Sequence, residues 1–260
     1  MASSQKYLNV AYMNIRGQTA LDIAKQVQIE QFIKFYKIDI LHCQEINILE
    51  DSFEHCDFIN SSYYIVANNA SNKYGTCSFI SNSFEAENIK LDTNGRVITF
   101  DIGNITLCNV YLPSGNDQFK RSSRENYSAE IIPQLLLNRK DIGFIGGDWN
   151  SITHEIDATK NTAQKMSPSL KRLITTFSWT DSFRYLHSKS QTFSRYYEHN
   201  KFGEGATRLD RQYHWGNVTV VEASYAGVAF SDHQVHIVKI QLPEINARIL
   251  SLKSNQRKNV

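Results

Sequence analysis

The sequence predicts an α/β protein in which β-sheets pack together and helices lie outside them. Two observations lead to this prediction. Short apolar segments bounded by turn residues recur along most of the chain, and only a few segments have the spacing of an amphipathic helix. With 260 residues, 41% of them hydrophobic, the chain is long enough to bury a sizeable core. The segments alone do not fix the order of the strands.

The N-terminal half predicts strands around one long helix. Residues 20–36 are expected to be helical, because apolar side chains recur there at i, i+3, i+4 and i+7. Strands are expected at residues 7–13, 38–43, 62–67, 76–80, 96–102 and 105–111, with asparagine and glycine between several of them.

The C-terminal half predicts two further helices. One covers residues 122–137, where Pro133 removes a backbone donor and should kink or restart the helix. The other covers residues 168–176, with Pro168 in its first turn. Strands are expected at residues 142–145, 192–197, 209–215, 218–223 and 234–241.

The chain is expected to form one domain over residues 1–243. No internal repeat or low-complexity tract interrupts it before that point. Residues 244–260 carry more basic than acidic side chains and are interpreted as a linker towards a longer polypeptide or as a disordered polar end.

Composition narrows the class of protein. No apolar run approaches the roughly 20 residues that cross a bilayer, so no membrane partner is expected. The N-terminus lacks the pattern of a secretory signal, and the four cysteines have no zinc-ligand spacing, which favours reduced thiols inside a cell. The net charge is only +2, so an overall basic field gives no argument for nucleic acid.

Polar side chains follow several of the predicted strands. Active sites assembled from strand ends are common, and this recurrence is the most informative feature of the sequence. The residues concerned are Asn14, Glu45, Asn109, Tyr111, Asp148, Asn150, Asp210, Ser231, Asp232 and His233.

Each motif taken alone has a purely structural alternative. Asn14 is compatible with a turn, Glu45 with a solvated strand end, and Tyr111 with a core aromatic residue. Gly146-Gly147 is compatible with a tight turn before an N-cap at Asp148. Asp210 is compatible with a local pair to Arg208 or Arg211, and residues 231–233 with a capped loop.

Taken together, these residues favour metal-assisted hydrolysis of a phosphoester. They are rich in oxygen donors and contain no cysteine, which suits Mg²⁺ or Mn²⁺ rather than zinc. The chain has neither a GxxxxGK[ST] loop nor a GxSxG elbow, which argues against a P-loop enzyme and a serine hydrolase. A metal and an imidazolium would offset transition-state charge while a carboxylate activates water.

These motifs resemble those of the endonuclease/exonuclease/phosphatase superfamily, in the same order along residues 8–241. Tyr111 resembles the apurinic-endonuclease branch, which includes the endonuclease domains of non-LTR (LINE-type) retrotransposons. Leu209-Asp210-Arg211 looks similar to Tx1-like elements. The motifs are Asn14, Gln44-Glu45, residues 109–113, Gly147-Asp148-Trp149-Asn150, residues 209–211 and Ser231-Asp232-His233.

The resemblance implies a four-layer α/β sandwich, two mixed β-sheets face to face with helices outside. It implies that Glu45 is the main magnesium ligand, with Asn14 and Asp232 close by. Asp148 would orient or activate the water, and Asn150 would hold the phosphate. Tyr111 and Asp210 would lie around the phosphate and leaving group. His233 would contact the non-bridging oxygens, with Asp232 fixing its ring.

The same resemblance implies a magnesium-dependent endonuclease that nicks double-stranded DNA and leaves a 3′-hydroxyl for priming reverse transcription. A continuous reverse transcriptase, action in the nucleus after cytoplasmic synthesis, and a monomeric isolated domain are the corresponding expectations. Residues 194–207 are expected to form a hairpin that enters a DNA groove, with a plain surface hairpin as the alternative. The expected DNA contacts are Arg121, Arg124, Arg195, Arg208, Arg211, Thr192 and Ser231.

Three other functions stay open at this stage. An apurinic/apyrimidinic-site repair endonuclease is the main alternative. However, many repair enzymes of this branch carry an acidic residue where this chain has Arg16. A small-molecule or lipid phosphatase is disfavoured by Tyr111, because those branches usually have histidine there. A non-catalytic binding module is disfavoured by the complete set of acidic and imidazole side chains.

Overall fold

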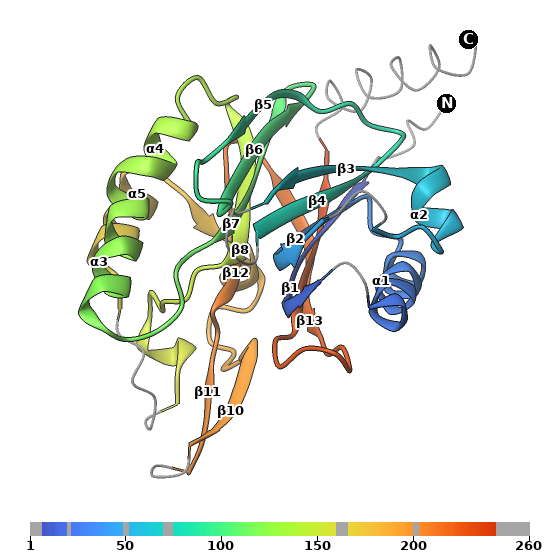
Figure 1. The fold of residues 1–260 in the computed structure, drawn as a ribbon. Coiled ribbons are helices and arrows are strands. Elements are labelled where there is room, and N and C mark those ends of the chain that lie inside the picture. The colour runs from blue at the N-terminus through green and yellow to red at the C-terminus, as the bar shows by residue number, and fades with distance from the viewer. Residues whose placement is uncertain are drawn as a thin grey trace.

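The structure is a computed structural model that describes residues 7–19, 22–48, 52–69, 75–159, 166–199 and 203–242. Within these ranges the strands form two six-stranded sheets and a two-stranded hairpin. Figure 1 shows the two sheets packed against each other with helices on their outer sides, so the four-layer α/β sandwich is confirmed. The predicted tail at residues 244–260 lies outside the described residues.

Both sheets are mixed. β1 runs parallel to β2 and β7 parallel to β8, while the other pairs are antiparallel. The first sheet has the order β13 (Thr219–Ala226), β14 (Val235–Gln241), β1 (Tyr7–Thr19), β2 (Ile40–Asn47), β4 (Gly75–Ser81) and β3 (Tyr63–Asn68). The second has the order β5 (Glu87–Leu91), β6 (Val97–Ile102), β7 (Ile105–Tyr111), β8 (Ile142–Asp148), β12 (Asp210–Trp215) and β9 (Thr180–Asp181).

The helices cover the outer faces. α1 (Ile23–Tyr36) and α2 (Asp57–Ser62) lie on the first sheet, and α3 (Gln118–Asn126), α4 (Ile132–Leu135) and α5 (Pro168–Thr176) on the second (Figure 1). A short α6 (Ser182–Leu186) follows β9. No helix in the described part of the chain is long and apolar enough to cross a membrane.

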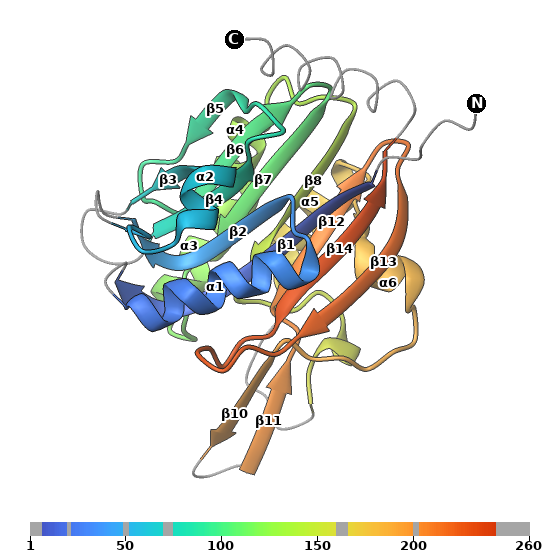
Figure 2. The same ribbon diagram turned by 90° about the vertical axis from the view of Figure 1, so that its right-hand side faces the viewer.

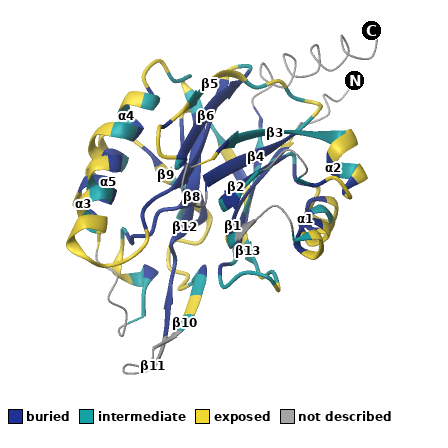
Figure 3. Ribbon diagram, in the orientation of Figure 1, coloured by how far each residue is buried: buried dark blue, intermediate teal, exposed yellow. Residues whose placement is uncertain are grey.

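The alternation of side chains along the strands builds the layers. On β1, Leu8 and Val10 enter the core between the sheets, whereas Ala11 and Met13 pack with Ile29 of α1. A third apolar cluster lies between the second sheet and α4–α5. Figure 3 shows the result, with buried strands in the middle and exposed helix surfaces outside.

Most of the predicted helices and strands are confirmed, but some of them begin, end or divide at other residues than expected. The helix expected at 122–137 is divided into α3, a π-helix at Tyr127–Ile131 and α4. The N–H of Ile132 bonds to Tyr127 O, just before Pro133, which has no N–H. The strand expected from residue 192 begins only at Arg195.

Five elements of the described residues were not predicted: β5, β9, α2, α6 and a 3₁₀-helix at Glu155–Asp157. β5 is mostly exposed and so lacks the alternation of a half-buried strand. All four cysteines are buried and free. The burial of Cys56 is not evident from the sequence, because its neighbours in the chain are polar.

Candidate active site

The inner faces of the two sheets change from apolar to polar towards one end of the strands. On β1 the apolar core residue Tyr12 is followed two positions later by Asn14, and on β8 Phe144 is followed four positions later by Asp148. Residues an even number of positions apart share a face of a strand, so these polar side chains also point between the sheets. Tyr111 and Asp210 are both register partners of Asp148, which brings the ends of β7, β8 and β12 together.

The amide of Asn14 joins carboxylates from both sheets. Its Nδ2 donates to Glu45 Oε1 at 3.1 Å and to Asp148 Oδ2 at 2.9 Å. The hydroxyl of Tyr111 also donates to Glu45 Oε1, at 3.1 Å. Four residues that the sequence placed at separate strand ends are therefore in direct contact, and Asn14 and Tyr111 are not merely turn and core residues.

Two glycines allow β8 to reach this cluster. A Cβ on Gly147, which has φ +134°, would lie 2.0 Å from Val110 O, and a Cβ on Gly146 would lie 2.6 Å from the Tyr12 ring. Both residues lie within β8, so the alternative of a tight turn is wrong. Glu45 and Asn150 have positive φ values of 56° and 46°, a backbone state that is uncommon for side-chain-bearing residues and clusters at functional sites.

Asp148 is held by amide donors. Its Oδ1 accepts from the Asn150 N–H at 2.9 Å, and its Oδ2 accepts from Asn14 and from Asn150 Nδ2 at 3.1 Å. Asn150 Nδ2 also donates to Leu112 O at 2.8 Å, so this amide helps to position Asp148, and its expected contact with the phosphate stays a prediction. Burial, reinforced by the negative charge of Asp210, raises the pKa of Asp148 above its usual value.

His233 and Asp210 form a buried pair. His233 Nδ1 lies 2.8 Å from Asp210 Oδ2, and the Ser194 hydroxyl donates to the same oxygen at 2.6 Å. Burial alone would lower the pKa of His233, but the charge of Asp210 and its hydrogen bond raise that pKa to about 9. His233 is therefore an imidazolium at neutral pH. A ring nitrogen of His233 and one carboxylate oxygen each of Asp148 and Asp210 all lie within 4.8 Å of one another.

The expectation that Asp232 fixes the His233 ring is wrong. Asp232 Oδ2 accepts instead from Arg195 Nε at 3.2 Å, and its Oδ1 lies 3.7 Å from Arg16 Nε. His233 forms a β-bridge with Arg195, and neighbouring side chains along such a segment point to opposite sides. His233 consequently faces Asp210 while Asp232 faces the arginines.

The donor set fits a divalent cation. Glu45, Asp148 and Asp210 contribute three carboxylates close to a single imidazolium, which leaves an excess of negative charge in a mostly buried place. The oxygen donors suit a hard ion. Of the three expected metal ligands, Glu45 and Asn14 are in contact, whereas Asp232 is paired with arginines.

Three of the arginines expected to contact DNA are structural, so those predictions are wrong. Arg124 is 6% exposed, and its Nη1 donates to the carbonyls of Pro113 and Gly115 at 2.7 Å. Arg208 and Arg211 are at most 1% exposed because acidic side chains from distant segments enclose them. Asp210 does not pair with either of these two neighbours.

The other expected DNA contacts have mixed placements. Arg195 remains 34% exposed beside Asp232 and adjoins the site. Ser231 Oγ donates to Asn14 O at 2.7 Å and accepts from the His233 N–H at 3.1 Å, so it ties these segments together. Arg121 and Thr192 are half-buried. Arg121 lines a separate small cavity, and Thr192 Oγ1 lies 3.0 Å from Ser190 Oγ.

Several residues of the site were not singled out from the sequence. Ser194 holds Asp210, and the guanidinium of Arg96 stacks 4.9 Å from the centre of the Tyr111 ring and donates to Tyr111 O. Ser194 is the first residue of the segment 194–207 that was expected to form a hairpin, which was the available signal. No sequence signal pointed to Arg96, because its contact with Tyr111 arises from the pairing between β6 and β7.

No protein-family model matches the chain, and no curated protein sequence matches it. Solved structures do share its fold. An AP endonuclease from Archaeoglobus fulgidus has a TM-score of 0.72 at 18% identity, over 89% of this chain and 98% of that one. The 3′ phosphatase NExo from Neisseria, bound to a product DNA hairpin, has a TM-score of 0.71 at 14% identity, over 90% and 100%. The AP endonuclease LMAP from Leishmania major has a TM-score of 0.70 at 18% identity, over 92% and 89%.

Proposed function

We propose that the protein is a divalent-metal-dependent phosphodiesterase that nicks double-stranded DNA. The observation that carries the proposal is the contact of Asp148 with Asn14 and Asn150, next to the His233–Asp210 pair. The structures with the same fold are named as enzymes that process DNA, which supports the same class of reaction.

The residues divide the chemistry between them. Asp148, fixed by two amides and with a raised pKa, orients and deprotonates the attacking water. His233, held as an imidazolium by Asp210, donates to a non-bridging oxygen and offsets the charge that develops on the phosphate. Tyr111, whose hydroxyl donates to Glu45, would lie near the phosphate and the leaving group. A bound Mg²⁺, with Mn²⁺ as a substitute, would neutralise phosphate charge at Glu45 and Asn14.

The proposal extends to the role of the nick. We infer that it leaves a 3′-hydroxyl that primes reverse transcription, in a LINE-type element whose polypeptide continues into a reverse transcriptase. The contact of Arg16 with Asp232, at the position where repair enzymes often carry an acid, supports this inference. The LINE-type proposal implies that the protein acts in the nucleus, which imaging of the tagged full-length protein would test. It also implies that the isolated domain is a monomer, which sedimentation would test.

The proposed activity is tested by nicking of a supercoiled plasmid in Mg²⁺. Asp148→Ala and His233→Ala should each lower the rate by roughly 100-fold or more, the usual contribution of a positioned acid or base. Asp141→Ala and His55→Ala are matched controls, because both side chains are exposed and neither belongs to the site. Retained nicking in both site variants would refute the assignment, as would nicking by the wild type in EDTA.

A second candidate is an apurinic/apyrimidinic-site repair endonuclease, which the names of two of the similar structures favour. Mapping the nicks separates the two. Discrete nicks in intact plasmid support a target-selecting endonuclease, whereas cleavage confined to abasic oligonucleotides supports repair.

A further inference from the structure

A cavity of about 670 Å³ opens on the outer face of the second sheet, and none of its lining residues belongs to the candidate active site. It lies between α5, the short 3₁₀-helix at Glu155–Asp157 and the segment after α6. Tyr213, which lines it, belongs to the apolar cluster outside the second sheet, whereas Asp210 faces between the sheets. The cavity has the size of a small-molecule site.

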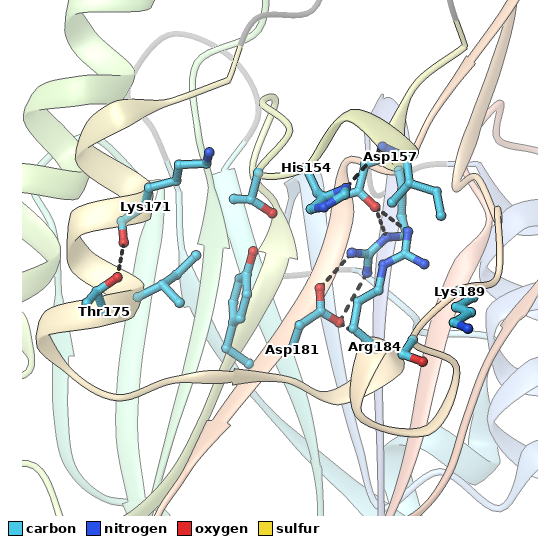
Figure 4. A pocket seen from close by; sticks show the side chains of 13 residues that line it. His154, Asp157, Lys171, Thr175, Asp181, Arg184 and Lys189 are labelled. Atoms are coloured by element: carbon cyan, nitrogen blue, oxygen red, sulfur yellow. Dashed lines mark hydrogen bonds and ion pairs between the residues drawn. The ribbon is translucent and has the colours of Figure 1, made fainter.

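The cavity is cationic at its rim. Lys171 and Lys189 are exposed, and the structure records no ion pair for either within the described residues. Figure 4 shows them on opposite sides of the cavity, with Asp157 and Asp181 between them. Arg184 adds a third cationic side chain to the lining, so the rim is suited to an anionic group.

The floor is a hydrogen-bonded network of buried charges. Arg208 Nε donates to Asp157 Oδ1 at 2.8 Å, and its Nη2 donates to Asp181 Oδ2 at 2.6 Å. Arg184 Nη2 donates to Asp157 Oδ1, also at 2.6 Å. Although burial acts to raise the pKa of both aspartates, the adjacent arginines hold those pKa values below the usual range. The network therefore keeps its charges at neutral pH.

The remaining lining indicates what the anion is attached to. Ile156, Ile174 and the Tyr213 ring supply an apolar wall. Asp181 Oδ2 accepts a single hydrogen bond within the described residues, from Arg208, so it can also accept one from a ligand hydroxyl. We propose that this cavity binds a mononucleotide, with the phosphate at Lys171, a sugar hydroxyl at Asp181 and the base against the apolar wall, while Lys189 adds positive charge from the opposite side.

The proposal is tested by calorimetric titration of the whole chain with AMP in EDTA. Lys171→Ala/Lys189→Ala should weaken AMP binding at least about tenfold, because charge-assisted hydrogen bonds to anions are strong. Thr175→Trp should also weaken it by filling the cavity from α5. Arg172→Ala is the matched control, since Arg172 is exposed on α5 next to Lys171 but does not line the cavity. Unchanged thermal melting would show that each variant folds.

The catalytic centre is the competing location for AMP. Binding that survives His233→Ala and is lost in the lysine variant supports the proposal. Binding lost in His233→Ala and retained in the lysine variant overturns it. Inorganic phosphate that binds as tightly as AMP would overturn the assignment of a nucleotide, since the apolar wall would then contribute nothing.

Discussion

At the scale of single residues, the charge of His233 depends on one buried neighbour. Asp210 bonds to its Nδ1, and Ser194 and the strand register of β12 fix Asp210 in turn. Asp232, the sequence neighbour of His233, bonds instead to Arg195. The geometry therefore assigns the orienting role to the residue that is distant in sequence.

Asp210→Asn should separate these roles. The substitution keeps the shape but removes the charge that holds the imidazolium, so the nicking rate at saturating DNA should fall by roughly 100-fold. Asp232→Asn should reduce that rate much less, because it leaves the His233–Asp210 pair intact. Steady-state nicking of a labelled duplex measures both. Equal losses in the two variants would contradict the assignment.

Asp39 provides a test of stability against pH. Burial raises its pKa to about 6, although a hydrogen bond from the Asn9 N–H, 2.8 Å from Oδ2, opposes the shift. A raised folded-state pKa means that stability is complete below the unfolded pKa near 3.8 and falls as pH rises through about 6. Asp39→Asn keeps the acceptor without the charge, so it should stabilise the protein by roughly 1–3 kcal/mol at pH 8 and little at pH 3.5.

Urea unfolding at the two pH values measures this difference. Thr175→Ala, which removes the exposed hydrogen bond from Thr175 Oγ1 to Lys171 O, is a control expected to be independent of pH. Equal stabilisation by Asp39→Asn at both pH values would show that the charge of Asp39 is not the cause.

At the scale of elements, the hairpin of β10 (Arg195–His199) and β11 (Gly203–Thr207) is attached firmly at its base. Arg195 bridges to His233, and Thr207 bridges to Ala158. Figure 2 shows the hairpin projecting away from both sheets. An exposed aromatic side chain, Tyr196, lies on it at 54% exposure. The predicted hairpin is confirmed, while its entry into a DNA groove stays a prediction.

Shortening the hairpin should change target choice without removing catalysis. Replacing residues 197–205 by Asn-Gly retains the pairs Arg195↔Thr207 and Tyr196↔Ala206 and closes them with a favoured turn. Nicks mapped on plasmid DNA should then spread over new positions while total nicking continues. Tyr196→Ala should show a weaker form of the same effect, and Tyr185→Ala, an equally exposed tyrosine on α6, should show none. An unchanged nick map in the shortened variant would refute the role of the hairpin.

At the scale of the molecule, buried polar side chains connect the two sheets near the site. Asn109 of β7 donates to the carbonyls of Cys43 and Cys77 in the first sheet, at 3.1 and 2.9 Å, and accepts from Gln44 at 2.7 Å. Unpaired buried polar groups are costly, so these contacts favour one relative placement of the sheets. The cluster of Glu45, Tyr111 and Asp148 depends on that placement.

Asn109→Ala should therefore affect both stability and catalysis. Loss of these bonds leaves buried polar groups of Cys43, Gln44 and Cys77 without this partner. The free energy of unfolding should therefore fall by about 2–4 kcal/mol. The nicking rate should fall as well, because β7 carries Tyr111. Chemical unfolding and plasmid nicking measure the two effects. A loss below about 0.5 kcal/mol, the level usual for surface substitutions, would contradict the role of this contact.

The sequence by itself determined most of the strands, the polar residues at their ends and the oxygen-rich chemistry of those residues. Alternation along β1, β7 and β8 is local, and it places Asn14, Tyr111 and Asp148 each on the same side of its strand as that strand's inward-facing apolar residues. Only the tertiary structure decided which polar residues pair. Arg208 is buried because Asp157 and Asp181, 51 and 27 positions away, enclose it, and His233 bonds to Asp210 across 23 positions. Whether a charged side chain is exposed or buried depends on the residues that pack against it, and the local sequence does not contain that information.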